Sequence, residues 1–152
     1  MKYKMFWPLM KDCITQDDKD AMVEFINSTN RFTNGPQVKE FEKAWSDWLG
    51  CKHSLFVSSG STANLLLVSA IKEKYNLSHG DKVLVPAMTW VTNISPVTQL
   101  GLTPIFCDVD KDNFGFDIKH LTYLAAKYPD IKVAFVTHLF GIAAIWIVTG
   151  KH

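Results

Sequence analysis

The fold is decided by residues 80–107, GDKVLVPAMTWVTNISPVTQLGLTPIFC, where two short apolar runs flank a helical stretch. The apolar runs lie at residues 83–85 and 105–107. Residues 91–100 predict a helix that Gly101 closes, because glycine tolerates the left-handed conformation of a helix end. Short continuous apolar runs are typical of strands covered on both faces, as in a parallel sheet. The stretch therefore predicts a strand-helix-strand unit.

The same alternation continues on both sides of this unit. Upstream, the apolar run at residues 55–57 predicts a strand, and residues 63 to about 75 predict a helix. Downstream, Asp117 is placed to cap a helix, and residues 133–136 predict a fourth strand. This order predicts an α/β fold with three layers, in which a mainly parallel sheet carries helices on both faces.

Two further helices are expected before the sheet. Thr15 and Asp18 form a capping-box pattern ahead of a helix at about residues 16–28. A second helix begins at Pro36, whose missing N–H costs nothing at that position, and ends before Gly50. Its apolar face is predicted to pack against the sheet and consists of Val38, Phe41, Trp45, Trp48 and Leu49.

Composition excludes several classes of function. The chain has 152 residues, 47% of them hydrophobic and 20% charged, with a formal net charge of +1. Nucleic-acid and anionic-membrane binders need a basic excess, which this chain lacks. The first residues carry no secretory leader pattern, so a cytoplasmic location is expected. The cysteines Cys13, Cys51 and Cys107 form no CxxC pair, and no disulfide framework or metal site is predicted.

Candidate ligand-binding residues follow the predicted strands, because ligands of parallel sheets bind beyond the carboxyl ends of the strands. The loop at residues 58–62, SSGST, leads into a helix whose first N–H groups and dipole favour an anion such as phosphate. It matches neither the GxGxxG fingerprint nor a Walker loop. A simple helix-capping cluster would give the same pattern, so both interpretations stay open.

Two aromatic side chains also follow predicted strands. Trp90 comes after the strand at residues 83–85 and is placed to stack on a planar ring, although a core or interface position is the simpler interpretation from spacing alone. His138 follows the strand at residues 133–136, where a hydrogen-bonded structural role is the simpler interpretation. Asp108 and Asp110 follow the strand at residues 105–107, where one of them is placed to cap a turn, and their placement does not predict a metal site.

Several blocks of the sequence together resemble a known family. The chain is similar to the amino-terminal part of the DegT/DnrJ/StrS-type sugar-nucleotide aminotransferases, which have the aspartate-aminotransferase fold (fold type I) and use pyridoxal 5′-phosphate (PLP). The resemblance covers about residues 30–141. Its blocks are GPQVKEFEKAWSDWLG (35–50), SSGSTANLL (58–66), GDKVLVPAMTWVT (80–92), GLTPIFCDVD (101–110) and VTHLFG (136–141).

The resemblance implies a domain organisation and a partial cofactor site. Residues 1–52 would be an amino-terminal helical segment, 53–141 part of the PLP-transferase large domain, and 142–152 an atypical tail. The resemblance implies PLP as cofactor, a nucleotide-sugar substrate, an amino donor and a homodimer. It assigns no catalytic residue to this chain. The residues that it assigns to the cofactor are Gly60, Ser61 and Thr62 at the phosphate and Trp90 on the pyridine ring.

The family's Schiff-base lysine and pyridine-binding aspartate have no counterpart among these blocks. The chain is therefore expected to be a fragment of such an aminotransferase and inactive alone. A fragment of a PLP-type sugar 3-dehydrase is an alternative, since SGSTANLL and the insertion at residues 72–79 resemble that branch. A non-catalytic folding or dimerisation module is another. A plain nucleotide-binding domain is disfavoured by the missing glycine fingerprint.

Overall fold

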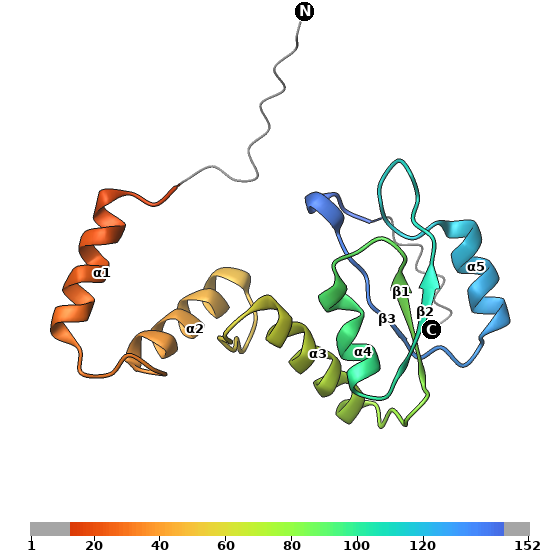
Figure 1. The fold of residues 1–152 in the computed structure, drawn as a ribbon, viewed down its shortest axis with the longest axis horizontal. Helices are drawn as coiled ribbons and strands as arrows, with labels where there is room; N and C mark the ends of the chain where they lie inside the picture. The colour runs from red at the N-terminus through yellow and green to blue at the C-terminus, as the bar shows by residue number, and fades with distance from the viewer. Residues whose placement is uncertain (1–12, 145–152) are drawn as a thin grey trace, which may run out of the picture. The chain divides into compact units, whose positions relative to one another are not determined.

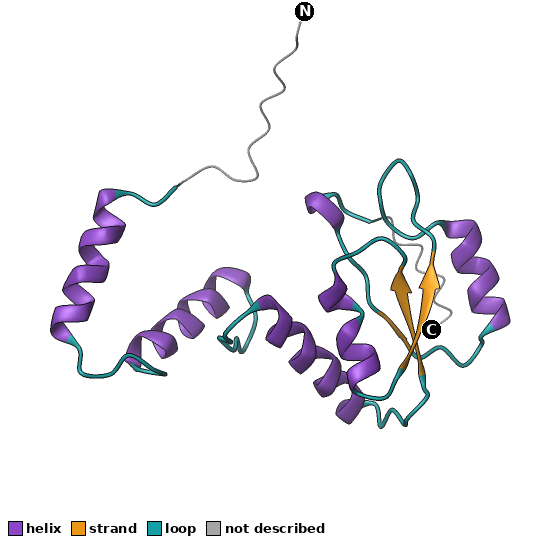
Figure 2. Cartoon of the chain, in the orientation of Figure 1, coloured by secondary structure: helices purple, strands orange, loops and turns teal. Residues whose placement is uncertain are grey.

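The computed structural model describes residues 13–144, and the chain divides into two compact units, Met1–Phe56 and Val57–His152 (Figure 1). The described part of the first unit is helical, and the second unit contains the sheet (Figure 2). No described helix is both long enough and apolar enough to cross a membrane. Most of the atypical tail, from residue 145 onward, lies outside the described residues.

The first unit holds helices α1 (Gln16–Ser28) and α2 (Pro36–Leu49). The predicted capping box is confirmed: the backbone N–H of Asp18 donates to Thr15 Oγ1 at 3.3 Å, and the N–H of Thr15 donates to Asp18 Oδ2 at 2.7 Å. The predicted end of α2 is also confirmed, since Gly50 has a left-handed backbone with φ of 73°. Local capping chemistry therefore sets the ends of both helices.

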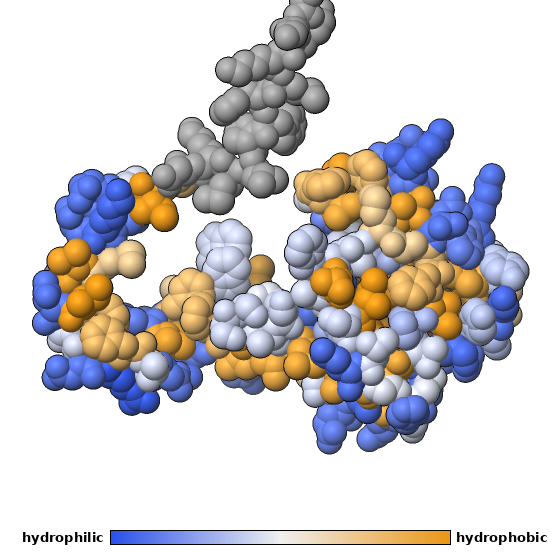
Figure 3. All heavy atoms as spheres, in the orientation of Figure 1, coloured by the Kyte–Doolittle hydropathy of each residue, from blue (hydrophilic) through white to orange (hydrophobic). Residues whose placement is uncertain are grey.

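Aromatic rings of the first unit contact one another at its surface. Phe41 stacks on Trp45 with ring centroids 5.9 Å apart, and it forms a T-shaped pair with Phe56 at a centroid distance of 5.4 Å. Trp45 also lies 5.0 Å from Trp48, whose side chain is 75% exposed. Figure 3 shows apolar surface along this unit. The packing of this face against the sheet stays a prediction.

The second unit contains the predicted parallel sheet. Its strands are β1 (Lys82–Pro86), β2 (Thr103–Cys107) and β3 (Val133–Ala134), in the order β2-β1-β3. Both β2 and β3 pair with β1 in parallel, and the register partners of Leu84 are Ile105 on β2 and Ala134 on β3. The carboxyl ends of these strands therefore lie at one edge, beyond which the sequence predicts candidate ligand-binding residues such as Trp90.

Helices cover both faces of the sheet, which confirms the three-layer α/β prediction. Residues 83 and 85 of β1 face α3 and α4, whereas Leu84 faces α5. On the α5 side, burial raises the pKa of the Cys107 thiol to about 11. The elements around the sheet are α3 (Gly60–Lys74), the 3₁₀ turn η1 (Val91–Asn93), α4 (Ser95–Gln99), α5 (Ile118–Lys127) and the 3₁₀ turn η2 (Leu139–Gly141).

The predicted helix at residues 91–100 is divided into η1 and α4. Pro96 has no N–H and cannot donate to the carbonyl of residue 92, so a continuous α-helix would lose a bond there. The helix α4 instead begins at Ser95, with the proline in its first turn. Its end agrees with the sequence, since Gly101 has φ of 74°.

The strand predicted at residues 55–57 is absent from the described structure, and this prediction was wrong. Leu55 and Phe56 are 71% and 56% exposed. The backbone N–H of Phe56 donates to Glu42 Oε1 at 3.0 Å rather than to a neighbouring strand. An apolar run becomes a strand only where another strand can pair with it. The strand predicted at residues 133–136 is shorter in the structure, where only Val133–Ala134 forms a strand.

Ion pairs lie at the amino-terminal edge of the sheet. The ammonium of Lys132 donates to Asp81 Oδ2 at 2.9 Å, and Lys82 pairs with Asp130. The Lys132 hydrogen bond and the N–H of Ser78 lower the pKa of Asp81 below its ordinary value. This edge is therefore cross-linked by charges.

Candidate functional site

The start of α3 is organised by a capping box between Ser59 and Thr62. The N–H of Thr62 donates to Ser59 Oγ at 3.2 Å, and the N–H of Ser59 donates to Thr62 Oγ1 at 3.0 Å. The Thr62 hydroxyl donates to the Ser59 carbonyl at 2.8 Å. The helix-capping interpretation of this loop is therefore confirmed. Within residues 13–144, the N–H groups of Gly60 and Ser61 have no such acceptor and remain available to an anion.

Open space at Gly60 makes those N–H groups accessible. A Cβ placed on Gly60 would meet no heavy atom within 4 Å, and its backbone does not have the left-handed conformation that favours glycine. Neither neighbouring atoms nor backbone strain therefore require glycine here. A glycine at this position leaves the backbone open to close approach by a ligand, which fits a phosphate at the helix start.

Trp90 lies beyond the carboxyl end of β1, as the sequence placed it. Its side chain is 73% exposed, so a core position for it is wrong. The Trp90 carbonyl accepts the N–H of Asn93 at 2.9 Å, which starts the turn η1. An exposed indole beside a backbone turn presents a flat apolar surface on which a planar ring can stack.

A network of side-chain amides and hydroxyls links the Trp90 segment to α3, and the sequence interpretation missed it. Asn64, in α3, donates through Nδ2 to Asn93 Oδ1 at 2.8 Å and to the Thr92 carbonyl at 3.2 Å. In the sequence, the only indication of this network was the amide side chain of Asn64, within the SSGSTANLL block. The structure thereby brings the segment after β1 beside the start of α3.

His138 takes part in the local fold of its loop, which agrees with the structural role expected for it. Its Nδ1 accepts the backbone N–H of Ala144 at 3.0 Å. Asp110 Oδ1 likewise accepts the N–H groups of Asp112 and Asn113, at 2.8 and 3.1 Å, which makes the predicted turn. Among the described residues no group of His, Cys, Asp and Glu could hold a metal ion.

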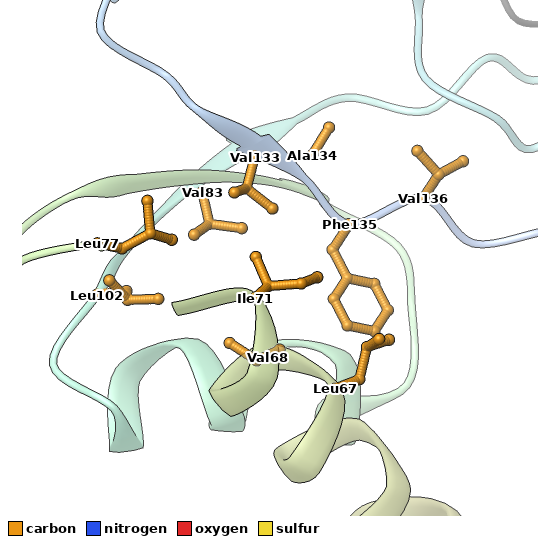
Figure 4. Close-up of a pocket in the computed structure, with 10 residues that line it drawn as sticks. All are labelled: Leu67, Val68, Ile71, Leu77, Val83, Leu102, Val133, Ala134, Phe135 and Val136. Carbon is orange, nitrogen blue, oxygen red and sulfur yellow. The ribbon is translucent and has the colours of Figure 1, made fainter. Parts of the chain in front are cut away.

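An apolar cavity of about 130 Å³ lies between α3 and the sheet (Figure 4). Figure 4 shows Leu67 and Phe135 pointing toward each other at one side of it. None of the predicted phosphate or ring residues lines this cavity. Its walls offer a phosphate no donors, so it is a gap in the packing of the core rather than a cofactor site.

The second unit thus combines a parallel α/β sheet with open N–H groups at a helix start and an exposed indole beyond the carboxyl end of β1, features that can bind a phosphate and a planar ring. The sequence pattern of the DegT/DnrJ/EryC1/StrS aminotransferase family matches residues 12–145, and the chain belongs to this family.

Relatives of the chain include enzymes of two kinds. It is 38% identical to GDP-4-keto-6-deoxy-D-mannose 3-dehydratase of Yersinia pseudotuberculosis, over 79% of this chain and 31% of the relative. It is 34% identical to UDP-4-amino-4-deoxy-L-arabinose–oxoglutarate aminotransferase of Shewanella sediminis, over 74% of this chain and 28% of the relative. The chain thus spans less than a third of the length of each.

A solved structure shares the fold. The Escherichia coli GDP-4-keto-6-deoxy-D-mannose-3-dehydratase, solved with bound hydrated PLP, is 35% identical and superposes with a TM-score of 0.71. The match covers 78% of this chain and 31% of that structure. The described fold is therefore part of a PLP-dependent aminotransferase fold.

Proposed function

We propose that this chain supplies the phosphate-binding and ring-stacking part of a PLP site, in an aminotransferase that acts on a nucleotide-linked keto-sugar. The observation that carries the proposal is the open helix start at Gly60 and Ser61, held beside the Trp90 segment in a chain of this family. Bound PLP supplies an electron sink at the reacting carbon.

Each proposed site residue has a distinct role. The N–H groups of Gly60 and Ser61 bind the phosphate, and the helix dipole adds to that attraction. Thr62 holds the loop in shape, because its hydroxyl and its N–H are both engaged with Ser59. Trp90 stacks on the pyridine ring. None of these groups transfers a proton, so we assign them binding and orientation, and we expect the chain alone to be inactive.

The 3-dehydratase is the second candidate function. The 38% identity to the Yersinia dehydratase exceeds the 34% identity to the Shewanella aminotransferase, which favours that branch. Both candidates require the same phosphate and ring contacts.

We also propose a homodimer and a cytoplasmic location, in keeping with a biosynthetic enzyme. A non-catalytic folding or dimerisation module would instead bind no cofactor.

Replacing Trp90 with alanine should weaken binding of pyridoxamine 5′-phosphate about tenfold, because stacking of an aromatic side chain on a ring is worth roughly 1–3 kcal/mol. This ligand has no aldehyde and cannot react with lysines, so calorimetry reports the non-covalent site. Trp48→Ala is the matched control, since Trp48 is equally exposed but lies in α2. Equal affinities for wild type and Trp90→Ala, or no binding by wild type, would contradict the proposal.

A further inference from the structure

We propose that Asn64 and Asn93 are positioning residues that hold the ring-stacking Trp90 in register with the phosphate-binding start of α3. The inference rests on the proposed function. It adds that the two parts of the proposed PLP site are coupled. The Trp90 indole can stack on the pyridine ring only while the amide network fixes the Trp90 segment relative to the phosphate site.

The hydrogen bonds of Asn93 connect segments that are far apart in the sequence. Asn93 Oδ1 accepts from Asn64 Nδ2 at 2.8 Å. Asn93 Nδ2 donates to Thr89 Oγ1 at 2.6 Å and to Thr137 Oγ1 at 3.0 Å. The hydroxyls of Thr89 and Thr137 are themselves 3.1 Å apart. One amide therefore joins α3, the loop after β1 and the loop after β3.

Trp90 lies inside the segment that this network fixes. Thr89 precedes it directly, and Asn64 holds the Thr92 carbonyl at 3.2 Å and the Thr92 hydroxyl at 3.3 Å. The segment is thus tied to other elements on both sides of the tryptophan. Trp90 itself is 73% exposed, so packing contributes little to the placement of its indole. The hydrogen bonds of the amide network therefore determine where the Trp90 segment lies.

The network is separate from the hydrophobic core that holds the sheet together. Its five side chains are each half-buried, at positions 64, 89, 92, 93 and 137, whereas the core is formed by buried residues such as Val83 and Val85. Half-buried amides lose hydrogen bonds when a partner is removed, which loosens the linked loops. Removing Asn93 should therefore free the Trp90 segment while the sheet persists.

The test compares Asn93→Ala with wild type for two ligands. Affinity for pyridoxamine 5′-phosphate should fall about tenfold, whereas affinity for inorganic phosphate, which needs only Gly60 and Ser61, should not change. Amide hydrogen exchange at residues 89–93 should become about tenfold faster, with β1 unaffected. Asn27→Ala, at an exposed amide of α1, is the matched control and should change none of these values.

A double-mutant cycle distinguishes positioning from general destabilisation. The Trp90→Ala/Asn93→Ala double variant should bind pyridoxamine 5′-phosphate no more weakly than Trp90→Ala, because Asn93 acts through the indole. Additive losses, an equal loss of phosphate affinity, or unchanged exchange would overturn the inference. If Asn93→Ala does not fold, Thr137→Val replaces it, and the same ligand affinities and amide exchange rates test the inference. Wild type that binds neither ligand would overturn the proposed function, and this inference with it.

Discussion

Gly60→Asp is expected to abolish binding of pyridoxamine 5′-phosphate while the chain stays folded. The new side chain would enter open space, since a Cβ at this position meets nothing within 4 Å. A carboxylate in the first turn of α3 is favourable for the helix, because it faces the positive end of the helix dipole. The same carboxylate repels phosphate at the N–H groups of Gly60 and Ser61. Charges about 4 Å apart near a protein surface support a loss of roughly 100-fold in affinity.

Two further variants make this result specific. Gln37→Asp changes the net charge equally and also lies in the first turn of a helix, α2, so it should not alter ligand binding. Gly60→Ala fills part of the space without adding charge and should cause a smaller loss. Calorimetry gives the affinities and circular dichroism gives the thermal unfolding midpoint. Retained affinity in Gly60→Asp would place the phosphate elsewhere.

Val85→Asp is expected to prevent folding of the second unit. Val85 is 0% exposed, in the middle strand of the sheet and against the core of α3 and α4. Burying an unpaired carboxylate costs several kcal/mol, out of a total stability of roughly 5–15 kcal/mol for a domain.

The neighbouring strand supplies the control for Val85→Asp. Phe106 pairs with Val85 in register but is 48% exposed, so a carboxylate there can stay in water. Phe106→Asp should therefore retain the dispersed amide resonances of a folded sheet, and Val85→Asp should lose them. If both variants fold equally well, the assignment of Val85 to the core is wrong.

The accuracy of the sequence-based predictions followed the range of the interactions involved. Helix ends were predictable because they depend on neighbours in sequence, such as Thr15 with Asp18 and the left-handed Gly50. The strand at residues 55–57 was not, because pairing needs a distant partner and Glu42 takes the N–H of Phe56. Local apolarity does not encode that choice.

The candidate site divides in the same way. The position of Trp90 beyond β1 followed from the rule that ligands bind beyond the carboxyl ends of parallel strands. The loop at residues 58–62 follows no strand in the structure, and the contact between Asn64 and Asn93 places the start of α3 beside the segment after β1. The amide network did not follow from that rule, because Asn64, Asn93 and Thr137 are scattered through the sequence. They acquire a shared role only once the sheet brings the ends of β1 and β3 together.

The most direct measurement is an NMR titration of the ¹⁵N-labelled chain with pyridoxamine 5′-phosphate and, separately, with pyridoxamine. We expect the phosphate-bearing ligand to shift the amides of Gly60 and Ser61 and the indole N–H of Trp90 in one saturable event, with a Kd on the order of 1 mM. Pyridoxamine, which lacks the phosphate, should leave the two amides unshifted. Equal shifts with both ligands, or shifts confined to other residues, would contradict a phosphate site at the start of α3.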